Sequence, residues 1–213
     1  MLVDTHCHLN FKVFEKDWRA VVERAQEVAD RSITLLRNEG DLLPLLGTRT
    51  ARVLSVTYRR PSDLMAGSVL NGRLRETYPR LVTAEVDLDT NPDVYEALLA
   101  RAGRSNLVVV SLNVTTVSYS GSVAVPDEMT DFIKELAGAG VPHVVISFGN
   151  PYLIRDFPDV QAYLLAWSGA AVSQRAAGRA LFGELEIQGR LPIRIPPDYR
   201  VGDGMHLPVR RER

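Results

Sequence analysis

Cysteine is almost missing from the sequence, and long hydrophobic runs are missing altogether. Cys7 is the single cysteine among 213 residues, so the chain cannot form an internal disulfide and is compatible with the reducing cytoplasm. No apolar run approaches the roughly 20 residues that a membrane-spanning helix needs. The opening residues MLVDTHCHLN carry charge and histidine where a signal peptide has an apolar segment. We therefore expect a cytoplasmic protein without a membrane anchor.

The sequence also lacks an excess of charge of either sign. Lysine and arginine number 25 and aspartate and glutamate 26, which gives a formal net charge of -1. Without a basic stripe, neither a nucleic acid nor a membrane surface is an expected partner. The sequence contains no GxGxxG pattern and no P-loop, so no cradle for nucleotide phosphates is predicted.

What is present suffices for one sizeable core, since 46% of the 213 residues are hydrophobic. We interpret residues 1–213 as a single domain that ends in a solvated tail at 209–213. Apolar runs predict strands at residues 51–58, 81–88, 106–114, 143–148 and 162–167. Amphipathic or capped segments predict helices at residues 11–29, 68–77, 93–102, 126–137 and 173–183. Two further elements are expected: a hairpin-like connector over residues 33–45 and a closing strand near 191–196.

The alternation of strands and helices decides the expected architecture. The run LVVVSLNV is nearly all apolar, which is typical of a parallel strand buried on both faces. Strands that alternate with helices are joined by right-handed crossovers, which place helices on both sides of the sheet. We therefore predict an α/β fold: a three-layer αβα sandwich, flavodoxin-like in layout, with a mostly parallel sheet of five to six strands.

Several motifs carry a family resemblance. The segments ADRSITLLRNEGDLLPL, FGNPY, FPDVQAYLLAW, SQRAAGRALFGE and GRLPIRIP occur in this order. From about residue 25 to 208 the chain resembles the C-terminal domain of glycoside hydrolase family 3, especially the β-N-acetylglucosaminidase-like branch. The resemblance implies an α/β sandwich beside a separate catalytic barrel that holds the nucleophilic aspartate and the acid/base histidine.

Neither of these catalytic motifs is found in the sequence, so the resemblance implies a non-catalytic sandwich domain. A retaining glycosidase needs two carboxylates on either side of the scissile bond. The sequence instead offers isolated carboxylates in expected turns and caps, where solvated or capping roles are typical. These residues are Asp87, Asp89, Asp156, Asp159 and Glu184.

The first 25 residues carry a different resemblance. The segment MLVDTHCHLNFKVFEKDWRAVVERA, with its DTHCHL motif, resembles the N-terminus of the TatD-type metal-dependent deoxyribonucleases. Alternate residues of a strand share one side, so Asp4, His6 and His8 could bind zinc or manganese together. In that family the histidines that match His6 and His8 are metal ligands, but its remaining ligands have no matching motif here. The competing hypothesis is thus a metal-dependent hydrolase or deoxyribonuclease; apart from this metal, no cofactor is expected.

The two resemblances meet inside one expected helix, with no glycine- or proline-rich linker between them. Residues 1–32 then form an N-terminal strand and helix of one family resemblance, and residues 33–208 form the sandwich of the other. This junction indicates a chimera, either natural or designed.

A third interpretation is a partner-dependent module, because the surface that contacts the barrel in the family would be bare. The expected partner is then a barrel domain or a second copy of the chain.

A parallel sheet offers a ligand crevice beyond the carboxyl ends of its strands. The loops expected there carry polar side chains that could form hydrogen bonds with a sugar-like small ligand. The candidates are Asn113, Thr115, Tyr119, Asn150 and Tyr152, with Arg59 and Arg60 on the wider rim.

Overall fold

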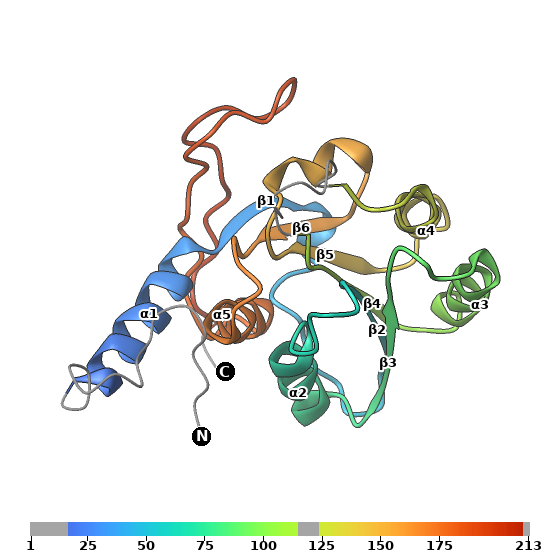
Figure 1. The fold of residues 1–213 in the computed structure, drawn as a ribbon, viewed down its shortest axis with the longest axis horizontal. Helices are drawn as coiled ribbons and strands as arrows, with labels where there is room; N and C mark the ends of the chain where they lie inside the picture. The colour runs from blue at the N-terminus through green and yellow to red at the C-terminus, as the bar shows by residue number, and fades with distance from the viewer. Residues whose placement is uncertain (1–16, 115–123, 211–213) are drawn as a thin grey trace.

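A six-stranded sheet forms the centre of the computed structural model, which describes residues 17–114 and 124–210 (Figure 1). The strands lie in the order β1-β6-β5-β4-β2-β3, and all neighbours are parallel except β1, which is antiparallel to β6. Their bounds are β1 Thr34–Asn38, β2 Arg52–Tyr58, β3 Arg80–Val86, β4 Leu107–Leu112, β5 His143–Ser147 and β6 Ala162–Leu165. The expected α/β fold with a single, mostly parallel sheet is confirmed.

Helices cover both faces of this sheet. One face carries α1 (Trp18–Ser32), α2 (Ser68–Thr77) and α5 (Ala171–Leu181), whereas the other carries α3 (Pro92–Ala102) and α4 (Asp127–Gly138) (Figure 1). Two short 3-10 helices, η2 (Glu39–Asp41) and η3 (Pro151–Asp156), lie in the connections. Within the described ranges no helix has both the length and the hydrophobicity that a membrane crossing needs.

Strand β4 shows why the sandwich has two cores. All six of its residues are buried. Val108 and Val110 pack towards α3 and α4, while Leu107 and Val109 pack towards α2 and α5. Because successive side chains of a strand point to opposite faces, an uninterrupted apolar run stabilises both helix layers at once.

The hairpin expected over residues 33–45 is wrong. Thr34–Asn38 is instead an edge strand of the main sheet, paired with β6, which lies far away in the sequence. The segment that follows is held by a side chain: Asn38 donates from Nδ2 to the Leu43 carbonyl at 3.0 Å and accepts from the Leu43 N–H at 2.9 Å. These two hydrogen bonds give the Leu43 backbone the partners that a second hairpin strand would have given it.

The closing strand expected near residues 191–196 is also wrong. After α5 the chain makes only isolated bridges, at Leu35 with Met205, Ile187 with Leu207 and Ile195 with Tyr199. Four prolines interrupt this segment, and proline has no N–H to donate to a sheet ladder. They are Pro192, Pro196, Pro197 and Pro208.

Helix α1 packs against α5 at the edge of the sandwich. Gln26 donates to the Val172 carbonyl at 3.1 Å, and Asp30 forms an ion pair with Arg179. Ala29 is its one buried residue. The described helix begins at Trp18 and extends to Ser32; residues 11–16, where the helix was expected to begin, and the expected N-terminal strand lie outside the described residues.

Gln174 on α5 fixes the start of α2. Gly67 precedes α2 and has no side chain to cap it. The buried Gln174 amide fulfils this role from α5: its oxygen accepts from the Val69 N–H at 3.1 Å, and its nitrogen donates to the carbonyls of Met65 and Gly169 at 3.0 and 2.8 Å. One side chain therefore joins α5, α2 and the loops after β2 and β6.

His143, the first residue of β5, is buried as a neutral ring. Its Nε2 accepts from the Gln161 N–H at 3.1 Å, so the proton lies on Nδ1, which donates to the Val141 carbonyl at 2.7 Å. Burial lowers the pKa of His143 below the 6.5 of a free histidine, and the bond to Val141 opposes this shift. Both ring nitrogens are thus occupied in a structural role.

We predict a pH-dependent stability that originates at His143. Between the lowered pKa of the folded protein and 6.5, the unfolded chain binds more protons, so the free energy of unfolding falls as the pH drops below 6.5. The slope from one such group is at most about 1.4 kcal/mol per pH unit. Urea unfolding of the wild type and of His143→Gln at several pH values measures it. Identical slopes for the two proteins would contradict the prediction.

Candidate functional site

The chain reverses its direction across the sheet at β2, and this reversal opens a crevice. From β2 the chain passes through α2 on one face to β3, whereas from β4 it passes through α4 on the other face to β5. The loops after β2 and β4 therefore diverge, which is the usual position of ligand sites in such sheets. A cavity of about 450 Å³ lies there, lined by Tyr58, Arg59, Arg60, Pro61, Ser62, Leu88, Asp89, Asn113, Val114 and Ala124.

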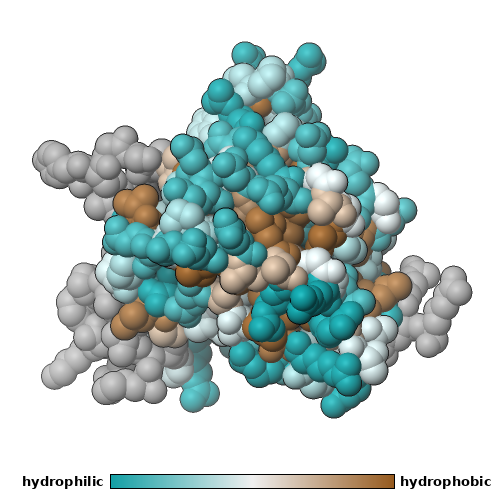
Figure 2. All heavy atoms as spheres, turned by 90° about the vertical axis from the view of Figure 1, so that its right-hand side faces the viewer, coloured by the Kyte–Doolittle hydropathy of each residue, from teal (hydrophilic) through white to brown (hydrophobic). Residues whose placement is uncertain are grey.

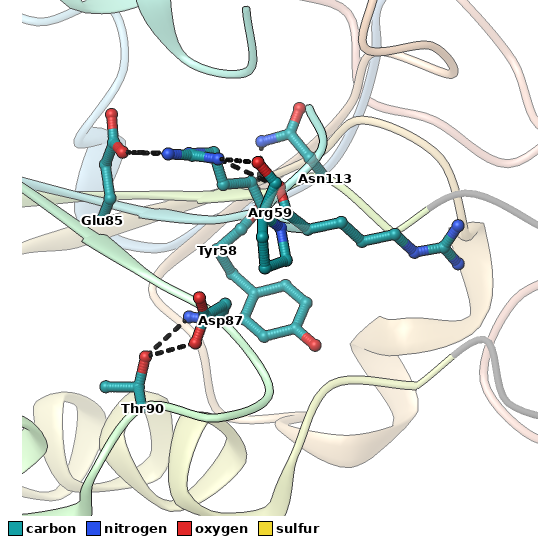
Figure 3. Close-up of polar contacts among 8 residues, drawn as sticks. Tyr58, Arg59, Glu85, Asp87, Thr90 and Asn113 are labelled. Carbon is teal, nitrogen blue, oxygen red and sulfur yellow. Dashed lines mark hydrogen bonds and ion pairs between the residues drawn. The ribbon is translucent and has the colours of Figure 1, made fainter. Parts of the chain in front are cut away.

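Arg59 shapes the wall of this cavity. Its Nε and Nη2 donate to one carboxylate oxygen of Glu85 on β3, at 2.9 and 2.6 Å (Figure 3). Its Nη1 donates to the carbonyls of Arg60 and Pro61 at 3.0 and 3.2 Å. These bonds direct the guanidinium to the protein itself, so Arg59 orders the loop after β2.

Asn113, directly after β4, is the described lining residue with a buried side-chain atom that lacks a hydrogen-bond partner. Its backbone N–H and its Nδ2 both donate to the Tyr58 carbonyl, at 2.9 and 3.3 Å. Its Oδ1 is buried and has no hydrogen-bond partner among the described residues. Gly169 leaves room beside it, because a Cβ at that residue would lie 3.3 Å from Oδ1. A buried acceptor without a donor is costly, so a ligand hydroxyl or a water molecule that donates here would be bound favourably.

The end of β3 closes the cavity with a turn. The Thr90 hydroxyl donates to the Asp87 carboxylate at 2.9 Å and accepts from the Asp87 N–H at 2.8 Å (Figure 3). The same carboxylate accepts from the Asp89 N–H at 3.0 Å. Asp87 is thus a turn-forming group, as its position in the sequence predicts. Asp89 is the one carboxylate among the described lining residues, and residues 115–123 contain no aspartate or glutamate. These parts of the chain do not supply the pair of carboxylates that glycoside hydrolysis needs.

Tyr58 adds a hydrogen-bond donor at the end of β2. Burial raises the pKa of its phenol; Arg60 lowers it and Asp87 raises it by smaller amounts. The phenol therefore stays protonated at neutral pH. The ring of Tyr58 lies on the side of Asp87, away from the Arg59 guanidinium (Figure 3). The cavity combines an acceptor from Asn113 and a donor from Tyr58 with the apolar side chain of Leu88, which is a suitable combination for a polyhydroxylated ligand.

The structure separates the residues that were grouped as ligand-binding candidates. Asn113 lines the cavity, but Asn150 and Tyr152 are absent from its described lining. Asn150 caps η3, because its Oδ1 accepts from the Tyr152 N–H at 2.9 Å, and its own N–H donates to the Val114 carbonyl at 3.0 Å. Thr115 and Tyr119 lie outside the described residues.

The proposed metal ligands Asp4, His6 and His8 also lie outside the described residues. Within the ranges that the structure does describe, no three histidine, cysteine, aspartate or glutamate side chains are placed to hold a metal ion. His206 contacts Glu186 at 2.7 Å on the surface. A metal centre therefore stays a prediction of the N-terminal motif alone.

Sequence reasoning missed Ser62, Leu88 and Asp89 as lining residues. They follow β2 and β3, and only the order of the strands shows that these ends lie beside the end of β4. The turn signals after each strand were visible, but nothing local in the sequence states that β2 lies between β3 and β4.

With this geometry established, comparison with known proteins decides the family. Residues 33–209 match the Glycosyl hydrolase family 3 C-terminal domain. The chain belongs to this family. A β-N-acetylglucosaminidase/β-glucosidase of Cellulomonas fimi is 27% identical over 177 residues, which cover 79% of this chain and 31% of that protein. The family 3 resemblance of the sequence is therefore confirmed for the sandwich.

Solved structures agree on the fold of this family 3 domain. A fungal multi-domain family 3 β-N-acetylglucosaminidase superposes with a TM-score of 0.70 at 23% identity, covering 88% of this chain and 20% of its own. A β-glucosidase from Listeria innocua in complex with isofagomine superposes with a TM-score of 0.68 at 18% identity, and the match covers 86% of this chain and 28% of the β-glucosidase chain. This chain thus spans about a third or less of the length of these relatives.

We predict that the connection from β2 to α2 depends on Gly67. Its φ is +73°, and an added Cβ would lie 2.6 Å from the Thr57 hydroxyl. Gly67→Ala is expected to lower the free energy of unfolding by about 1–3 kcal/mol. Gly72→Ala is the matched control, because Gly72 lies inside α2 with open space around it; it should be neutral or stabilising by up to about 1 kcal/mol. Equal effects in chemical denaturation would contradict this account.

Proposed function

We propose that this family 3 sandwich domain binds a sugar-like ligand in the crevice at the ends of β2, β3 and β4 and supplies no catalytic nucleophile. The observation that carries the proposal is the buried, unpartnered Oδ1 of Asn113. The one carboxylate in the described lining supports a binding role over hydrolysis. Relatives described as acting on β-N-acetylglucosaminides and β-glucosides suggest N-acetylglucosamine and glucose as first ligands.

We further propose that the same edge of the sheet contacts a protein partner, either a catalytic barrel or a second copy of the chain. Three large apolar side chains are strongly exposed in the loops after β2 and β3: Leu64 at 75%, Met65 at 64% and Leu88 at 73%. Apolar groups gathered at one end of a sheet favour a contact surface over free solvent. The greater length of the relatives supports the barrel as the occupant.

Calorimetric titration with N-acetylglucosamine and with glucose tests the ligand proposal. We predict that Asn113→Ala weakens binding by about tenfold, because a hydrogen bond of roughly 1–1.5 kcal/mol is lost. Asn106→Ala is the matched control: Asn106 precedes β4 as Asn113 follows it, and its Oδ1 accepts from the Arg52 N–H at the opposite edge. The control should bind like the wild type.

Two results would contradict the proposal. If both asparagine variants weaken binding equally, the ligand does not lie at the crevice. If the chain cleaves an aryl β-N-acetylglucosaminide above the uncatalysed rate, the domain is catalytic by itself.

We also propose, from the TatD-like motif alone, that residues 1–32 have an origin separate from the sandwich. The family 3 match begins at residue 33, directly after α1, which is compatible with this division. In this proposal Asp4, His6 and His8 bind a divalent metal and provide a hydrolase or deoxyribonuclease site.

Titration of the metal-free protein with zinc and manganese tests this second proposal. Binding is expected for the wild type and should be lost in the His6→Ala/His8→Ala double variant, because both imidazole ligands are removed. Binding that persists in the double variant, or none in the wild type, would refute the metal site.

A further inference from the structure

A second groove lies at the opposite edge of the sheet, where β2 and β3 begin. It encloses about 400 Å³ between these strand ends and the outer side of α3. Figure 2 shows the side of the molecule with β3 and α3: apolar residues gather in its middle, and hydrophilic residues surround them. Four arginines belong to the lining, which comprises Arg52, Val53, Arg80, Val82, Ala97, Ala100, Arg101, Arg104 and Ser105.

The fold brings these four arginines together from the starts of β2 and β3, the last turn of α3 and the turn after it. Arg52 and Arg80 are register partners at the starts of β2 and β3, so they lie side by side on one face. Arg101 lies in the last turn of α3, and Arg104 lies in the turn that follows the helix, where its N–H donates to the Arg101 carbonyl at 3.0 Å. Val82 forms part of the floor and remains 37% exposed, because β3 is the edge strand.

Among the described residues, no carboxylate forms an ion pair with the groove arginines. The ion pairs found between described residues use other cations, namely Arg31, Arg37, Arg59, Arg73, Arg179 and His206. The Ser105 hydroxyl donates to the Arg101 carbonyl at 3.0 Å. The groove is therefore a concentrated positive site in a chain whose formal net charge is -1.

Helix capping explains only part of this charge. Arg101 lies in the last turn of α3, where a cation interacts favourably with the negative end of the helix dipole. Arg52 and Arg80 begin strands, where no such field requires a cation. Four like charges around one concavity repel one another, so an anion that enters it gains binding energy from all four.

We propose that this groove binds a small phosphate-bearing anion with at least two negative charges. Guanidinium groups form paired hydrogen bonds with phosphate oxygens, and four of them can surround a diphosphate-like group. A volume of about 400 Å³ suits a small molecule. The groove lies at the amino ends of the strands and the Asn113 cavity at their carboxyl ends, so the two sites are separate.

Titration calorimetry with inorganic pyrophosphate at constant ionic strength tests the proposal. We expect saturable binding that weakens at least tenfold in Arg101→Gln/Arg104→Gln, because both guanidinium groups are removed, while glutamine remains a good helix former at residue 101. The matched control is Arg24→Gln/Arg75→Gln, which removes two exposed helix arginines elsewhere, Arg75 also lying in a last turn. Its affinity should stay within twofold of the wild type.

Three outcomes would overturn the proposal. The first is that pyrophosphate does not bind. The second is that both double variants lose affinity equally, which would indicate a response to overall charge. The third is that an oligoglutamate peptide binds more tightly than pyrophosphate, which would make the groove a peptide-binding surface.

Discussion

The position of β2 between β3 and β4 is the constraint on which both surface sites depend. Parallel strands are joined by right-handed crossovers, so a chain that moves first to one side of β2 and then to the other must place its helices on opposite faces. At the carboxyl ends the loops diverge and leave the Asn113 cavity between them. At the amino ends β2 and β3 start in register, which places Arg52 beside Arg80.

The buried side-chain amides differ in whether both of their ends have hydrogen-bond partners. Asn38 uses both ends of its side chain on Leu43, and Gln174 uses both ends on α2 and the adjacent loops. Asn113 uses only its nitrogen, and its oxygen stays without a partner in the described structure. Of the described buried side-chain atoms without a hydrogen-bond partner, this oxygen is the one that belongs to a residue lining the Asn113 cavity.

Membership of the glycoside hydrolase family 3 C-terminal domain family and the cavity chemistry agree with each other. The described lining provides a hydrogen-bond acceptor, a protonated phenol and one carboxylate, but no pair of carboxylates. Such a set can orient a sugar and cannot by itself perform the two-carboxylate reaction. The exposed apolar side chains at the same edge are the basis of the proposed partner contact.

The local parts of the fold were predictable because they depend on local signals. The helix expected at residues 68–77 matches α2, and the strands expected at 51–58 and 143–148 match β2 and β5 within one residue. Strand β1 was mistaken for a hairpin because its partner β6 lies more than 120 residues away, and no local pattern encodes that pairing.

The candidate site was only half predictable for the same reason. Asn113 was found because it follows an apolar strand and is polar. Asn150 satisfied the same criterion, yet its side chain caps η3. Leu88 and Asp89 were missed because strand order, a tertiary property, brings the end of β3 to the cavity.

An amide-resolved nuclear magnetic resonance titration with N-acetylglucosamine tests the central claim most directly. The account predicts that the largest shift changes fall on residues 58–62, 88–89 and 113–114, which follow three adjacent strands. Changes concentrated on residues 150–152 or on the arginine groove, or no changes at saturating sugar, would contradict it.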